Sequence, residues 1–265
     1  MKRTCLQEPQ TPMRMSAYEF HPTIKKTNHL RIKFFKIIIL VLFVAFSASC
    51  SKNSDDSTVV GDAIVVAKKS GANTVYAMAY YAYAYSPLKS VIVESMVDPS
   101  NQAALVSNGL YTSNFIKEPT DADFSTTKPS ADTFTFSAVF ETGSTYKTED
   151  AITADILAPA TIEKCTYNST KSYAELSWTA VTNADSYGIT VFDDSGAIVF
   201  KTGELANTVT SGNLSTSETG WTTGHPVSGK TYKIRVQAFQ YEDSANPNSY
   251  HIQSTSYAEA SIVWG

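Results

Sequence analysis

The sequence has 265 residues, of which 21 are Lys or Arg and 25 are Asp or Glu, so the formal net charge is −4. Basic residues are sparse over most of the chain, and Arg235 is the only arginine after residue 49. Because proteins bind nucleic acid through clustered Lys and Arg that displace phosphate counterions, this composition excludes nucleic acid as a partner and disfavours direct binding to anionic lipid.

Residues 31–50 have the parts of a secretory signal. A cationic stretch, Arg31 to Lys36, precedes ten apolar residues (37–46), and the small residues 47–49 lead to Cys50. The apolar run is shorter than the roughly 20 residues that a membrane-spanning helix needs. We therefore predict a cleaved leader over residues 1–49, with ordinary secretion or a retained anchor helix as the alternatives to the lipoprotein interpretation given next.

With Cys50 at the cut, the segment resembles the signal of a bacterial lipoprotein, as found in Bacteroidetes. The resemblance implies that Cys50 is lipidated, with palmitate among its acyl chains, and becomes the mature N-terminus. It also implies a lipid anchor in the outer membrane and exposure at the cell surface. Asp55 and Asp56 resemble the surface-export signal of the same group, whereas Ser47 departs from the Leu usual at its position.

Residues 1–29 fit no part of this signal, because they contain three prolines and no periodic apolar pattern. We expect translation to begin near Leu30 rather than at Met1.

Removal of the leader changes the charge and the cysteine content. Residues 1–49 hold eight basic and two acidic residues, which leaves 13 basic and 23 acidic residues and a formal charge of −10. Such an acidic surface keeps an exported protein soluble. Cys5 is also removed and Cys50 would carry lipid, so Cys165 has no partner for an internal disulfide. We expect Cys165 to be a small buried hydrophobic residue in a strand.

After residue 58 the sequence predicts an all-β fold. Short runs of alternating apolar and polar residues are separated by Gly, Asn, Asp and Pro, which is typical of a β-sandwich or barrel. Pro159 stands between two strand-like runs and marks a domain joint. We therefore predict a tether over residues 50–58 and two tandem β-sandwich domains over residues 59–158 and 159–265.

Three strand patterns in the second domain carry a specific resemblance. They are Leu176-x-Trp178, Tyr187-x-Ile189-x-Val191 and Gly229-x-x-Tyr232-x-Ile234-x-Val236-x-Ala238. These patterns are similar to strands B, C and F of a fibronectin type III domain. The resemblance implies a core position for Trp178 and a tyrosine corner at Tyr232, with its hydroxyl bonded to the backbone upstream. The first domain has no counterpart of Trp178, so we predict only an Ig-like sandwich there.

Five tyrosines fall within ten residues, namely Tyr76, Tyr80, Tyr81, Tyr83 and Tyr85. Alternation places the last three on one face of a strand and the first two on the other. In one interpretation large rings cover both faces of a buried strand. In the other, the rings form an exposed strip for stacking on sugars or a partner, which makes Tyr81 and Tyr83 candidate ligand contacts.

Trp221 lies in a polar segment, residues 211–224, ahead of the predicted tyrosine corner. A tryptophan there either caps the edge of the core or projects to contact a ligand. Trp221 is therefore a third candidate ligand contact.

Motifs for catalysis or metal binding are missing from the sequence. His225 and His251 are the only histidines after residue 49, and they lack the spacing of metal ligands. No nucleophile elbow, glycine-rich phosphate loop or calcium loop occurs. The acidic pairs Asp121/Asp123, Glu149-Asp150 and Asp193-Asp194 adjoin turn residues, and we interpret them as local hydrogen-bonding groups.

The sequence thus predicts a non-catalytic surface lipoprotein, without cofactor or metal, that binds or adheres to a glycan or a protein partner. A structural spacer or an assembly subunit of an outer-membrane complex is the first alternative. A hydrolase whose site lacks a recognisable motif is the second.

Overall fold

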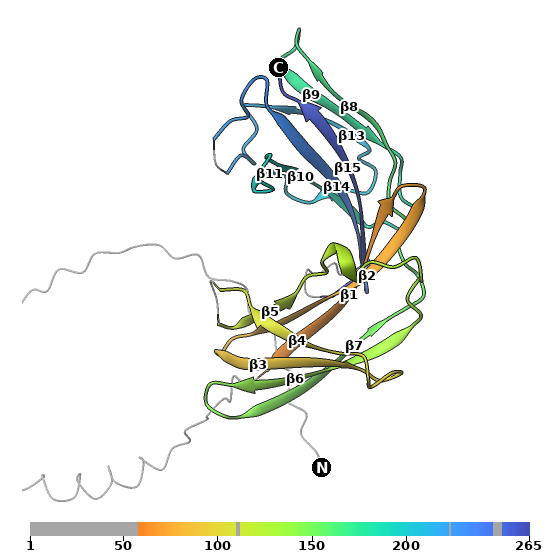
Figure 1. The fold of residues 1–265 in the computed structure, drawn as a ribbon, viewed down its shortest axis with the longest axis vertical. Helices are drawn as coiled ribbons and strands as arrows, with labels where there is room; N and C mark the ends of the chain where they lie inside the picture. The colour runs from red at the N-terminus through yellow and green to blue at the C-terminus, as the bar shows by residue number, and fades with distance from the viewer. Residues whose placement is uncertain (1–57, 110–111, 223, 246–250) are drawn as a thin grey trace, which may run out of the picture. The chain divides into compact units, whose positions relative to one another are not determined.

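The computed structural model describes residues 58–109, 112–222, 224–245 and 251–265. These residues form strands β1 to β15 and one short 3-10 helix, η1 (Asp121–Asp123) (Figure 1). Among them, no helix has the length and apolar character to cross a membrane. The predicted signal, Cys50 and most of the predicted tether lie outside the described residues.

The C-terminal half is a sandwich of two sheets. One sheet has the order β13-β9-β8, and the other runs β11-β10-β14-β15 with β12 beside β10. The strands are β8 (Ile162–Asn168), β9 (Tyr173–Trp178), β10 (Ser186–Phe192), β11 (Ile198–Lys201), β12 (Leu205–Ala206), β13 (Ser211–Ser215), β14 (Thr231–Tyr241) and β15 (Ile252–Val263). Alternate residues of β9, β10 and β14 face inward and form one core, as their patterns predict.

Two side chains expected from the fibronectin resemblance take their predicted places. Trp178 is 2% exposed and packs edge-on against Tyr187, with ring centroids 5.7 Å apart. The Val227 N–H donates a hydrogen bond to the Tyr232 hydroxyl over 2.9 Å, which forms the tyrosine corner. Both predictions are confirmed.

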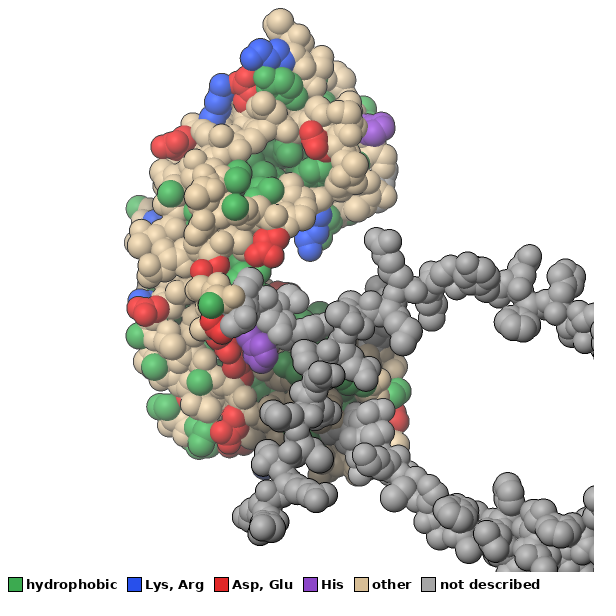
Figure 2. All heavy atoms as spheres, turned by 180° about the vertical axis from the view of Figure 1, so that it is seen from behind, with side chains coloured by type: hydrophobic (Ala, Val, Ile, Leu, Met, Phe, Trp, Pro, Cys, Tyr) green, Lys and Arg blue, Asp and Glu red, His purple; other side chains and the backbone are tan. Residues whose placement is uncertain are grey.

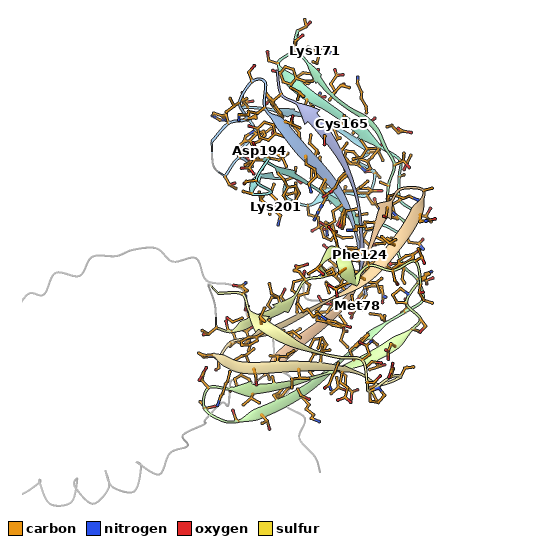
Figure 3. All side chains as sticks on the ribbon, viewed as in Figure 1. Met78, Phe124, Cys165, Lys171, Asp194 and Lys201 are labelled. Carbon is orange, nitrogen blue, oxygen red and sulfur yellow. The ribbon has the colours of Figure 1, made fainter. Side chains whose placement is uncertain are left out.

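Cys165 lies in β8 and is half-buried against the C-terminal core (Figure 3). Burial raises the pKa of its thiol. Cys165 is therefore an inert packing residue, although it is less buried than we expected.

The N-terminal half has a second core. The strands are β1 (Val59–Ser70), β2 (Asn73–Ala84), β3 (Leu88–Ser95), β4 (Gln102–Ser107), β5 (Asn114–Lys117), β6 (Asp132–Phe140) and β7 (Thr145–Ile152). Strand β4 pairs with both β3 and β5, so the order is β1-β2-β5-β4-β3-β6-β7. The ring of Phe136 packs so closely on β1 that a Cβ at Gly61 would lie 2.4 Å from it, so only glycine fits there.

The two halves share one continuous sheet. Strand β15 pairs antiparallel with β14 and parallel with β1, in the register Val65↔Ser254 to Lys68↔Tyr257. Both halves belong to one compact unit of the chain, and each keeps its own core. The predicted class, an all-β chain of Ig-like and fibronectin type III-like sandwiches, is confirmed, while the domain division at residues 158 and 159 stays a prediction.

Candidate functional site

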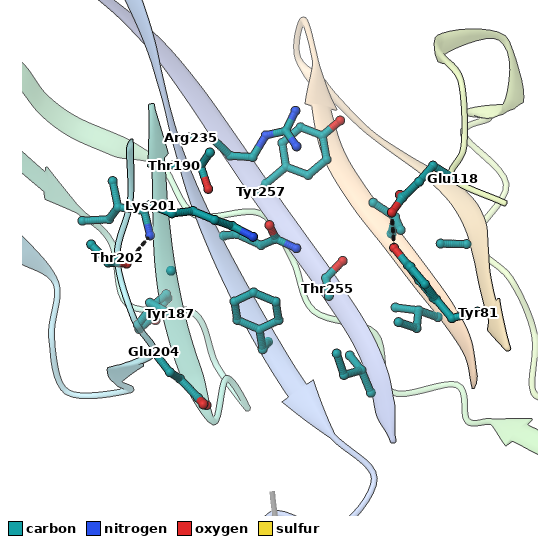
Figure 4. A pocket seen from close by; sticks show the side chains of 18 of the residues that line it. Tyr81, Glu118, Tyr187, Thr190, Lys201, Thr202, Glu204, Arg235, Thr255 and Tyr257 are labelled. Carbon is teal, nitrogen blue, oxygen red and sulfur yellow. Dashed lines mark hydrogen bonds between the residues drawn. The ribbon is translucent and has the colours of Figure 1, made fainter. Parts of the chain in front are cut away.

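The outer face of the continuous sheet, on the side away from both cores, is hollowed into a groove (Figure 4). Successive side chains of each strand point alternately to a core and to the opposite face of the sheet, where the groove lies. In β14, Ile234 and Val236 point into the C-terminal core, while Arg235 and Gln237 point into the groove. In β1, Val65 points into the N-terminal core while Ile64 points into the groove. The groove encloses about 600 Å³ and spans strands of both halves.

The floor of the groove is apolar. Ile64, Val66 and Ala79 are buried there, and Tyr81, Phe124, Ile252 and Tyr257 pack against them. This small cluster covers the seam where β1 meets β15. The floor is therefore built across the junction of the two halves and would not exist in either half alone.

Tyr81 and Tyr83 of β2 lie together on one side of the groove. Their rings are parallel within 1°, with centroids 6.2 Å apart. The Tyr81 hydroxyl donates a hydrogen bond to the Glu118 carboxylate, and burial raises the pKa of this tyrosine. Tyr76 and Tyr80 pack instead against the N-terminal core, so the predicted division between the two faces is confirmed for the four tyrosines that lie within β2. Tyr85 follows the end of β2 and is 90% exposed.

Basic and hydroxyl side chains line the other side of the groove. The Arg235 guanidinium lies 4.0 Å from the ring centroid of Tyr257, and its Nε and Nη2 both donate to Glu259. Lys201, the last residue of β11, extends its side chain into the groove (Figure 4). Polar side chains of four other residues complete this side, namely Thr190, Thr202, Gln237 and Thr255.

Trp221 lies apart from these residues and does not line the groove. Its ring packs against Phe200 and Trp264, with centroids 4.7 and 5.6 Å away, and its Nε1–H donates to the Ser215 carbonyl. This half-buried position agrees with a tryptophan that caps the edge of the C-terminal core. A ligand contact at Trp221 stays a prediction, as it does at Tyr81 and Tyr83.

A second cluster joins three carboxyl groups that are distant in sequence. Asp62 of β1, Asp150 of β7 and Glu242, which follows β14, bring their carboxylate oxygens within 4.8 Å of one another. The Asp150 carboxylate accepts a hydrogen bond from the Ala63 N–H over 2.7 Å, and Asp62 accepts one from the Ile252 N–H. Asp62 is 1% exposed and Asp150 is 9% exposed.

The interpretation of Asp150 as a local turn residue is wrong, because it lies inside β7 and bonds to a backbone amide 87 residues away. The corresponding interpretation holds for Asp193, whose carboxylate accepts from the Ser195 and Ala197 N–H groups. It also holds for Asp123, which accepts from the Thr120 N–H. Asp121 differs, since it forms an ion pair with Lys68 on β1.

Burial and mutual repulsion control the chemistry of the three carboxyls. Burial and the nearby Asp150 raise the pKa of Asp62 to about 8. Burial and the same neighbour raise the pKa of Glu242 to about 7. His251 is the basic side chain that faces this cluster among the described residues, with its Nδ1 3.7 Å from Glu242.

The cluster suits proton storage better than catalysis or metal binding. Asp62 and Asp150 are almost fully buried and offer a substrate almost no surface, although Asp62 is among the residues that line the groove. A calcium ion takes six to eight oxygen ligands, which is more than these three carboxyl groups supply with one ligand atom each. We therefore treat Asp62 and Glu242 as the proton-storing members of a carboxyl network that they form with Asp150.

No protein-family model and no curated protein matches the chain. Among solved structures, a two-domain fibronectin type III segment of chicken tenascin is similar, with 12% identity and a TM-score of 0.27 over 75% of this chain and 97% of that one. The fibronectin(III)-like modules of Clostridium thermocellum CbhA match with 10% identity and a TM-score of 0.25, over 76% and 90% of the two chains. The BSP domain of a biofilm-associated protein matches with 9% identity and a TM-score of 0.24, over 84% and 55%.

Proposed function

We propose that the protein is a non-catalytic, lipid-anchored binding protein of the bacterial cell surface that captures a glycan chain in the groove. The groove itself is the observation that carries this proposal. It combines an apolar floor, the parallel rings of Tyr81 and Tyr83, and a side rich in hydroxyl and amide groups. Ligand sites commonly pair an apolar surface with a few polar groups that fix orientation.

The composition of the groove favours carbohydrate over a purely apolar ligand. Sugars present apolar ring faces that pack on aromatic side chains, and they present hydroxyls that need hydrogen-bonding partners. The aromatic surface for the sugar rings is supplied by Tyr81 and Tyr83. Hydrogen-bonding partners for the sugar hydroxyls are supplied by four polar side chains of the groove, namely Thr190, Thr202, Gln237 and Thr255. Because the groove crosses several neighbouring strands, it has room for an extended chain of sugars.

Replacement of Tyr83 by Ala is expected to weaken glycan binding at least tenfold, which corresponds to about 1.4 kcal/mol. The change removes one of the two parallel tyrosine rings that line the groove. The measurement is titration of the purified protein with the glycan that binds best on an array. Tyr85→Ala is the matched control, because this ring is exposed and follows the end of β2.

If the Tyr83→Ala variant binds the glycan as tightly as the wild-type protein does, the paired tyrosine rings are not the binding site. If no glycan binds the wild-type protein and a membrane complex co-purifies with it, the chain acts instead as a spacer or assembly subunit.

Membrane attachment through Cys50 is the second part of the proposal, and it is supported by the signal pattern of residues 31–50. Replacement of Cys50 by Ala is expected to remove the lipid, so that the protein leaves the membrane fraction. Cell fractionation and metabolic labelling with palmitate measure this, with Cys165→Ala, a change at the cysteine of β8, as the control that keeps both properties. Membrane association that survives the Cys50→Ala change would contradict a lipid anchor at this residue.

A further inference from the structure

We infer that the groove selects glycan chains that carry carboxylate groups, and that Lys201 is the residue that binds the carboxylate. This inference rests on the proposed function, because it specifies the chemistry of the glycan in the same groove.

Among the residues that the structure describes, Lys201 is the free cation of the groove. Its side chain is exposed and extends into the groove, and no described residue forms an ion pair or a hydrogen bond with its ammonium group (Figure 4). Its backbone is fixed, since the N–H donates to the Gly220 carbonyl over 3.0 Å. Lys201 therefore presents its charge from the end of an ordered strand.

Three other basic side chains on the groove face of this sheet or beside it already form ion pairs. Arg235, which also lines the groove, donates twice to Glu259, and Lys233 lies 3.3 Å from the same carboxylate. Lys68 pairs with Asp121. Binding of an anion by these groups would require an existing ion pair to break, whereas binding by Lys201 would not.

The acidic groups of the groove have partners other than Lys201. The Glu118 carboxylate accepts a hydrogen bond from the Tyr81 hydroxyl, and the Glu204 carboxylate accepts one from the Tyr241 hydroxyl over 2.8 Å. The third acidic group, Asp62, holds a proton at neutral pH. Elsewhere the surface is acidic, and carboxylate side chains recur over the face seen in Figure 2. A free ammonium in this setting attracts an anion into the groove and not onto the surrounding surface.

One free ammonium among hydroxyl groups fits a particular kind of anion. Nucleic acids and anionic membranes are held by many cations together, which the described part of the groove lacks. A sugar carboxylate needs a single cation and adjacent partners for the hydroxyls of the ring, such as Thr190, Thr202 and Thr255. We therefore assign the ligand to uronic acid-type polymers, with neighbouring sugars stacked on Tyr81 and Tyr83.

The test compares two polymers with the same sugar backbone, polygalacturonate, whose carboxylates are charged, and its fully methyl-esterified form, whose ester groups are neutral. Calorimetric titration of the full-length protein in detergent is expected to give at least tenfold tighter binding of polygalacturonate, with affinity that falls as salt is added. Lys201→Met is expected to remove this preference, so that the variant binds the two polymers with equal affinity. Lys147→Met, the same change at an exposed position on β7, is expected to retain the preference.

Each other outcome has a defined meaning. If the two polymers bind equally, or if Lys201→Met retains the preference, the assignment of Lys201 is overturned while the groove remains a glycan site. If polygalacturonate does not bind but a neutral glycan does and depends on Tyr83, the ligand class is overturned and the proposed function stands. If no glycan binds, both fail. Circular dichroism of each variant separates loss of binding from loss of folding.

Discussion

The free energy of unfolding is expected to fall as the pH rises from about 4 to about 8, because native Asp62 and Glu242 hold protons that the unfolded chain releases. Both groups have a raised pKa in the folded state. Their stabilising contribution is therefore complete below the ordinary pKa of a carboxyl and is lost as the pH passes through about 7 for Glu242 and about 8 for Asp62. Above that range, Asp62 and Glu242 are both ionised although burial disfavours their charged forms.

The expected size of this effect is several kcal/mol. A tenfold change in proton affinity is worth about 1.4 kcal/mol. The rise of the Asp62 pKa from 3.8 to about 8 thus sets an upper limit of about 6 kcal/mol for this residue. Exposed carboxyls with a lowered pKa, such as Asp123 and Asp193, act in the opposite direction and only in more acidic solution.

Asp62→Asn tests this expectation, because Asn keeps the shape of the side chain and cannot ionise. Urea denaturation at pH 5 and pH 9 is expected to show a smaller loss of stability in the variant, which should exceed the wild type at pH 9. Asp194→Asn, an exposed position in the hairpin between β10 and β11, should behave as the wild type (Figure 3). A wild-type protein that is equally stable at both pH values would contradict proton storage in the cluster.

Trp178→Ala is expected to lower the free energy of unfolding by about 3–5 kcal/mol. Trp178 is 2% exposed and belongs to the C-terminal core, where it packs against Tyr187. Truncation removes the burial of a large ring and leaves a cavity that the surrounding strands cannot fill. Chemical denaturation monitored by circular dichroism measures the loss.

Trp178→Phe provides the comparison. The Trp178 Nε1–H has no hydrogen-bond partner in the described part of the chain, so its removal costs no hydrogen bond. The loss for Phe should therefore be clearly smaller than the loss for Ala. Val227→Ala, at a side chain that is 58% exposed, should change stability by less than about 0.5 kcal/mol. Equal losses for Ala and Phe would show that the indole N–H, and not the packed ring, matters at this position.

The features that the sequence predicted correctly depend on neighbours along the chain. Alternation in Tyr173–Trp178 and Thr231–Tyr241 determines which side chains enter the core, and the tyrosine corner joins residues five apart. The division of the tyrosines between the two faces of β2 follows from the same period of two. Such features can be inferred from a short window of sequence.

The groove and the carboxyl network depend on pairing between distant strands. Asp62 meets Glu242 only because β1 lies beside β15, and nothing in the local pattern of either strand indicates that pairing. One signal was present, since Asp62 is an acidic residue inside an apolar run, Val59 to Ala67. A buried charge in such a run indicates a partner elsewhere in the chain, but the sequence does not identify that partner.

The parallel pairing of β1 with β15 also determines when folding can finish. The first strand of the described chain needs a partner that lies almost 190 residues later, and contacts so far apart in sequence form slowly. Until the last strand has been synthesised, one edge of β1 exposes unpaired backbone groups, which can pair with other chains. The groove is therefore among the last parts of the molecule to assemble, and a chain that lacks its final strand has no capacity to bind there.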